Sequence, residues 1–124
     1  MTRILLVDDD LGALGSTAEL LQAFGYDVTT CSEANRVCDM IRKELPDLVL
    51  HDVRMPGLDI RAQVRSIRDD PYISHIPIVL FTAVFSAKEL AREIGADDAI
   101  EKPFDSEVLR RVVRDSKAGR KTGS

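Results

Sequence analysis

Five short apolar runs alternate along this chain with five longer stretches whose apolar residues recur at helical spacing, and this alternation restricts the fold most strongly. The apolar runs cover residues 3–7, 26–30, 47–52, 77–82 and 98–101. The helical stretches cover residues 11–24, 33–45, 59–68, 86–94 and 105–116, and we expect Ser86 to cap the fourth. Apolar strands joined by helices form parallel sheets that are covered on both faces. We therefore predict an α/β fold, a (βα)5 doubly wound parallel five-stranded sheet.

Length and composition are those of one ordinary globular domain. The chain has 124 residues, of which 44% are hydrophobic and 31% are charged. No apolar run is long enough to cross a membrane, and carboxylates follow the first residues too soon for a secretory signal. The two cysteines, Cys31 and Cys38, match no zinc-binding spacing. We expect a cytoplasmic protein that does not bind a membrane.

Charge is distributed unevenly along the chain. The net charge is −4, but residues 102–124 hold seven basic and three acidic residues, so the first 101 residues carry −8. An acidic body argues against direct nucleic acid binding, because that affinity comes largely from neutralising phosphates. Residues 117–124 are interpreted as a flexible basic tail, and a weak contact with an acidic partner is the alternative.

Polar residues follow the apolar runs where function is expected. In open α/β sheets, binding sites lie beyond the carboxyl ends of the strands. The residues delivered there are Asp8, Asp9 and Asp10 after the first run, Asp52 after the third, Thr82 after the fourth and Lys102 after the fifth. No glycine-rich phosphate loop follows the first run, which argues against a nucleotide site of that kind.

The residue types at this edge favour phosphoryl transfer to a carboxylate. Clustered carboxylates repel one another, and an all-oxygen ligand set suits Mg²⁺. A lysine and a threonine hydroxyl can contact phosphoryl oxygens, while an aspartate acts as the nucleophile. Each residue alone also has an ordinary structural explanation; Asp10, for example, is placed to cap the first helix. The combination is what predicts an aspartyl phosphate.

These residues lie in segments that resemble the receiver domain of bacterial two-component response regulators, of the chemotaxis-Y-like kind. The segments are residues 4–10, 47–57, 81–83 and 95–104, and the resemblance extends over about residues 2–115. It implies a receiver domain over residues 1–116, with the flavodoxin-like strand order 2-1-3-4-5.

The resemblance implies a role for each residue of the acidic edge. Asp52 is the phosphoacceptor, and Mg²⁺ is the cofactor. Asp8 and Asp9 position the metal, together with Asp52 and the backbone carbonyl of Arg54.

The remaining implied roles concern the switch and the partners. Thr82 and Lys102 contact the phosphoryl group, and the Lys102–Pro103 peptide bond is cis. Phosphate comes from a sensor histidine kinase or a phosphotransfer protein, and the output goes to a downstream protein target or to an effector domain absent from this chain. The resemblance is also compatible with a homodimer. The protein is then no enzyme, beyond catalysing its own phosphorylation and dephosphorylation.

Three positions and one shortened stretch depart from the family pattern. Ala99 stands where the family commonly has a switching aromatic residue. Phe85 is a candidate substitute, although we interpret it first as an ordinary core or surface phenylalanine. The stretch 82–102 is about two residues short of the common pattern. Ile60 occupies a frequent glycine position. His51 precedes Asp52, where the family usually has an apolar residue. We interpret it as a histidine hydrogen-bonded behind the strand and pointing away from the phosphate, and the alternative is a residue that tunes the lifetime of the phosphoryl group.

Two other functions fit parts of the sequence. Asp8 and Asp10 also match the Asp-x-Asp motif of haloacid-dehalogenase-like phosphatases, with Asp8 as nucleophile and Asp10 as acid. Alternatively, the receiver fold serves as an interaction module whose output does not follow phosphorylation in the usual way, as Ala99 suggests.

Overall fold

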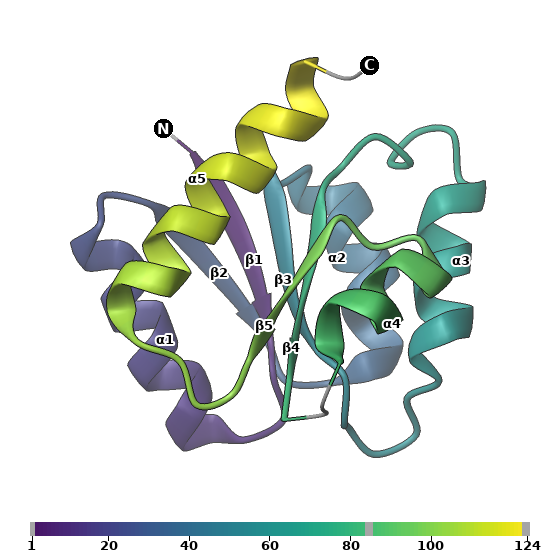
Figure 1. Cartoon of the computed structure of the whole chain (residues 1–124). Coiled ribbons are helices and arrows are strands. Elements are labelled where there is room, and N and C mark those ends of the chain that lie inside the picture. The colour runs from purple at the N-terminus through teal and green to yellow at the C-terminus, as the bar shows by residue number, and fades with distance from the viewer. Residues whose placement is uncertain (1, 84–85, 123–124) are drawn as a thin grey trace.

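The computed structural model describes residues 2–83 and 86–122, the last six as backbone alone. Its elements are β1 (Arg3–Val7), α1 (Leu11–Ala23), β2 (Asp27–Cys31), the 3-10 helix η1 (Ala34–Arg36), α2 (Val37–Glu44), β3 (Leu48–Asp52), α3 (Ile60–Asp69), β4 (Ile78–Thr82), α4 (Ala87–Ile94), β5 (Asp98–Glu101) and α5 (Ser106–Thr122). All strands pair in parallel in the order β2-β1-β3-β4-β5. Helices α1 and α5 cover one face of the sheet, and α2, α3 and α4 cover the other (Figure 1). The predicted (βα)5 fold and strand order are confirmed.

Successive strand residues are buried on opposite faces of the sheet. Ile4 and Leu6 pack with apolar residues of α1 and α5, whereas Leu5 and Val7 pack with those of α2, α3 and α4. Every residue of β3 and β4 is buried. A shift of one residue in a strand would exchange all its side chains between the two layers. Two apolar layers therefore define the register that places each strand's last residue at the functional edge.

Aspartates start several helices next to the carboxyl ends of the strands. The side chains of Asp10, Asp59 and Asp105 accept hydrogen bonds from backbone N–H groups in the first turns of α1, α3 and α5. The prediction that the Ser86 side chain caps the fourth helix, α4, is wrong. Ser86 has a left-handed backbone with φ of 66°, and its side chain makes no capping bond to α4 in the described structure. An extended backbone is what normally aims a capping oxygen at the helix.

Some boundaries differ from the predicted ones. The stretch 33–45 divides into η1 and α2, since the chain enters this helix through a 3-10 turn, a common form of helix start. The last helix continues beyond residue 116 to Thr122. The division into a domain and a flexible tail at residue 117 stays a prediction. Among the described residues, none of the helices has the length and apolar character needed to span a membrane.

Candidate functional site

Three carboxylates from two neighbouring strands meet at the carboxyl edge of the sheet. Asp8 and Asp9 directly follow β1, and Asp52 is the last residue of β3, which pairs with β1. One carboxylate oxygen from each lies within 4.8 Å of the others. Asp8 and Asp52 are buried, whereas Asp9 is exposed. This arrangement brings together the three carboxylates predicted to surround a metal ion.

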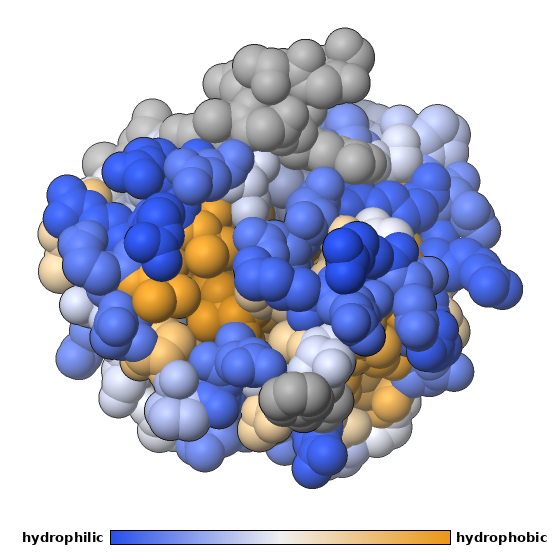
Figure 2. Space-filling view, viewed as in Figure 1, coloured by the Kyte–Doolittle hydropathy of each residue, from blue (hydrophilic) through white to orange (hydrophobic). Residues whose placement is uncertain are grey.

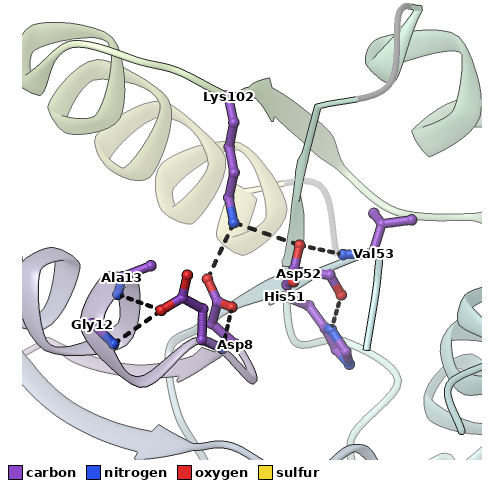
Figure 3. Close-up of polar contacts among 8 residues, drawn as sticks. Asp8, Gly12, Ala13, His51, Asp52, Val53 and Lys102 are labelled. Carbon is purple, nitrogen blue, oxygen red and sulfur yellow. Dashed lines mark hydrogen bonds and ion pairs between the residues drawn. The ribbon is translucent and has the colours of Figure 1, made fainter. Parts of the chain in front are cut away.

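Lys102 supplies the positive charge of this cluster. Its Nζ donates to Asp8 Oδ2 at 3.1 Å and lies 3.6 Å from Asp52 Oδ1 (Figure 3). The backbone N–H of Lys102 donates to the carbonyl of Thr82 at 2.8 Å, which joins the ends of β4 and β5. The Lys102–Pro103 peptide bond is cis, the isomer that the resemblance implies. The side chain thus reaches from the β5 end to both buried carboxylates.

The Asp52 carboxyl lies where its charged form is disfavoured. Burial raises the pKa of Asp52 above its usual value, Lys102 opposes this shift, and the charge of Asp8 adds to it. The backbone N–H of Val53 donates to Asp52 Oδ1 at 2.9 Å and also favours the charged form. Any further positive charge brought to the cluster would therefore stabilise the ionised form of Asp52.

The other predicted site residues surround this cluster at different depths. Thr82, the last residue of β4, is buried, and Arg54 lies in the loop two residues after β3. The role predicted for the Arg54 carbonyl stays a prediction. Asp10 lies next to the cluster, but its Oδ1 accepts from the N–H groups of Gly12 and Ala13. Its side chain thus caps α1, which does not favour Asp10 as the acid of a phosphatase.

His51 is fully buried beneath the acidic cluster. Its Nδ1 lies 2.6 Å from the backbone oxygen of Asp52, and its Nε2 lies 3.3 Å from the side-chain nitrogen of Gln63 on α3. Burial lowers the pKa of His51 to about 4. The expectation of a histidine hydrogen-bonded behind the strand is confirmed. Gln63 was missed in the sequence, where a polar residue between Ile60 and Val64 on the apolar side of α3 was the available signal.

Ala99 lies under α4 with other small residues. It belongs to the same buried apolar cluster as Ala87 and Ala91 of that helix. The position where the family commonly has an aromatic residue therefore carries a small side chain packed against α4. The candidate substitute, Phe85, lies outside the described residues.

Comparison with known proteins agrees with this geometry. Residues 4–114 match the family model described as the response regulator receiver domain. Response regulator PleD of Caulobacter vibrioides is 38% identical over 114 residues, which cover 90% of this chain and 25% of PleD. The chain thus spans about a quarter of the length of that relative.

Solved structures resemble this fold along nearly the whole chain. Chemotaxis response regulator CheY4 of Vibrio cholerae has a TM-score of 0.84 and 27% identity, covering 92% of this chain and 97% of that one. The receiver domain of a sensor histidine kinase from Pseudomonas aeruginosa PAO1 has a TM-score of 0.84 and 27% identity, covering 94% and 98%, and holds a magnesium ion in its active site cleft. With its fold, its acidic edge and its matching residues in agreement, this chain belongs to the receiver domain family of two-component response regulators.

Proposed function

We propose that Asp52 accepts a phosphoryl group from the phosphohistidine of a sensor histidine kinase or phosphotransfer protein, and that this modification changes the contacts of the domain with a downstream protein. The observation that carries the proposal is the position of Lys102, whose Nζ lies between the buried carboxylates of Asp8 and Asp52. A lysine in this place can pair with a phosphoryl oxygen once Asp52 carries the group.

The transfer itself requires little covalent chemistry from the protein. An oxygen of Asp52 forms a bond to phosphorus, the P–N bond of phosphohistidine breaks, and the imidazole leaves with the electron pair and takes up a proton. The backbone N–H of Val53 and the Nζ of Lys102 both contact Oδ1 of the Asp52 carboxylate, and a backbone hydrogen bond from Arg54 also reaches this carboxylate. Thr82, buried at the end of the adjacent strand, is assigned the hydrogen bond to the transferred group.

The residues of the cluster fit a magnesium ion. Three carboxylates with oxygens within 4.8 Å, two of them buried, form an all-oxygen donor set with excess negative charge. Asp9 and Asp52 would hold the ion directly, Asp8 would assist, and the backbone carbonyl of Arg54 would complete the protein ligands. When bound, Mg²⁺ supplies charge neutralisation for the transferred phosphoryl group.

The test is the mass of the intact protein after incubation with acetyl phosphate, with and without Mg²⁺. The wild type is expected to gain one phosphoryl group only with Mg²⁺, and Asp52→Asn is expected to gain none. Asp10→Asn is the matched control: it changes a neighbouring carboxylate that caps α1, and it should still be labelled. Labelling of Asp52→Asn at the wild-type rate would refute the assignment.

Ala99 favours a second candidate function, an interaction module whose output does not follow phosphorylation in the usual way. Position 99 carries an alanine, packed in the same buried cluster as Ala87 and Ala91, so the aromatic rotation common in the family cannot occur there. Amide chemical shifts distinguish the two functions. Changes in β4, β5 and α4 on phosphorylation support the switch, and unchanged shifts in a labelled protein support the interaction module.

A further inference from the structure

One peptide group connects the buried His51 to the carboxylate of Asp52. The peptide group between Asp52 and Val53 contributes a carbonyl and an N–H that move together, because the group is planar. Its carbonyl lies 2.6 Å from His51 Nδ1. Its N–H donates to Asp52 Oδ1 at 2.9 Å and to the carbonyl of Phe81 on β4 at 3.1 Å. The orientation of this one group therefore determines a hydrogen bond on the Asp52 carboxylate.

The imidazole has one arrangement of donors that satisfies its neighbours. A carbonyl oxygen only accepts, so Nδ1 carries the proton and donates to Asp52, and Nε2 accepts from the amide of Gln63. Figure 3 shows the ring below the Asp52 carboxylate, on the side away from Lys102. The ring therefore contacts the backbone oxygen of Asp52 and lies on the opposite side of this residue from Lys102.

Gln63 in turn is held by two segments of the same layer. Its side-chain nitrogen donates to the carbonyl of Ala34 in η1 at 2.9 Å, and its oxygen lies 3.7 Å from Cys38 Sγ on α2. A buried polar pair costs free energy unless each of its groups has a partner. Here the polar side-chain atoms of His51 and Gln63 each have a partner. Continuous polar contacts therefore connect η1 and α2, through Gln63 on α3, to the end of β3.

We propose that His51, held by Gln63, is a positioning residue for the phosphorylation of Asp52, acting through the Asp52–Val53 peptide group. The inference rests on the proposed function. It gives a reason for a buried histidine at a position where the family usually has an apolar residue. An apolar side chain fills the same space, but it leaves the Asp52 carbonyl without this donor.

The experiment compares four proteins in two measurements: the wild type, His51→Leu, His51→Asn and Val49→Ala. The measurements are the rate of Mg²⁺-dependent labelling by acetyl phosphate and the amide chemical shift of Val53 in the unlabelled protein. The side-chain nitrogen of asparagine occupies the place of Nδ1, so His51→Asn keeps the donor while losing the contact with Gln63. Val49 is buried on the same face of β3, so Val49→Ala controls for loss of packing.

The expected result is a labelling rate about two- to tenfold lower in His51→Leu, the range that one hydrogen bond allows, with a shifted Val53 amide. His51→Asn should recover much of the rate and move the Val53 shift back toward the wild type. Val49→Ala should be less stable but should be labelled at the wild-type rate.

Three results would overturn the inference. A His51→Leu protein with the wild-type rate and Val53 shift shows that the ring positions nothing. Equal slowing in Val49→Ala attributes the effect to packing. A wild type that takes up no phosphoryl group refutes the proposed function, and the inference with it, and so differs from a failure of the inference alone.

Discussion

Three influences act on the charge of the Asp52 carboxyl: its burial, the like charge of Asp8 and the opposite charge of Lys102. Burial disfavours the charged carboxylate and the charge of Asp8 adds to this, while Lys102 compensates only in part. Functional sites often keep such a balance at the expense of stability, because the charge is needed for chemistry. Two predictions at the residue scale follow from the titration of this region.

Replacing Asp52 with asparagine should stabilise the metal-free protein at neutral pH. Because the pKa of Asp52 is raised in the folded state, the folded protein holds its proton more tightly than the unfolded chain does. The wild type therefore loses stability as the pH rises from the ordinary aspartate pKa through the raised one. Urea unfolding in EDTA should show a gain for Asp52→Asn that is present at pH 7 and absent near pH 3. A variant less stable than the wild type at pH 7 would contradict this.

His51 should make the protein sensitive to acid. Its pKa falls from 6.5 in the unfolded chain to about 4 in the folded protein, so the folded state binds fewer protons between these values. Stability is then fully present above pH 6.5 and decreases toward pH 4, by up to about 3 kcal/mol. His51→Leu should lack this contribution, and urea unfolding from pH 7 to pH 4 measures it. Parallel pH profiles for the two proteins would show that the histidine does not titrate in this way.

At the scale of elements, α4 and β5 form a small-residue contact beside a groove. The groove has a volume of about 820 Å³ and is lined by residues of α4, β5 and α5, Ala99 among them. Figure 2 shows an apolar area over α5 on this side of the molecule, bordered by hydrophilic side chains. Ala91 shares the buried cluster but is not among the described residues that line the groove.

This difference predicts different costs for the same substitution at two buried alanines. Ala99→Tyr should lower the free energy of unfolding by less than about 1 kcal/mol, because the ring can turn into the groove, whereas Ala91→Tyr should cost about 3 kcal/mol through overpacking. Urea unfolding of both variants is the measurement. Equal losses would mean that the groove does not accept a side chain from β5.

A second feature at this scale is the set of contacts made by Arg68 at the end of α3. Its guanidinium donates to the carbonyls of Gly95, Ser74 and Ile76, at 2.9, 2.9 and 2.7 Å, and to Asp97 Oδ2 at 2.7 Å. Arg68→Leu should lower the free energy of unfolding by about 2–4 kcal/mol, since it removes these hydrogen bonds and the positive charge that is paired with a largely buried carboxylate. Thermal or urea unfolding checks this.

Arg61, on the same helix, provides the control for Arg68. It pairs with Glu93 at 2.8 Å, but both side chains are about 60% exposed, whereas those of Arg68 and Asp97 are 17% exposed. Arg61→Leu should therefore change the free energy of unfolding by less than about 1 kcal/mol. A loss as large as that of Arg68→Leu would mean that burial does not decide the value of these pairs.

At the scale of the whole molecule, magnesium should stabilise the folded protein by mass action. Only the folded chain brings the carboxylates of Asp8, Asp9 and Asp52 together. At ten times its dissociation constant, Mg²⁺ should add about 1.4 kcal/mol and raise Tm by about 5 °C. Thermal unfolding with and without Mg²⁺ at matched ionic strength measures this. Asp9→Asn should lose most of the increase and Asp10→Asn should keep it; an equal increase in both variants would place the ion elsewhere.

The sequence by itself determined the order and type of the elements, because apolar periodicity and helix-starting aspartates act between residues close in the chain. It also predicted that Asp8, Asp52 and Lys102 share one edge, since strands of a parallel sheet end on the same side. Tertiary structure decided which side chains touch. The pairing of Lys102 with Asp8 joins residues 94 positions apart, and the contacts of His51 with Gln63 and of Arg68 with Asp97 cross between elements. Local patterns do not specify such contacts, because they depend on how closely each helix packs on the sheet.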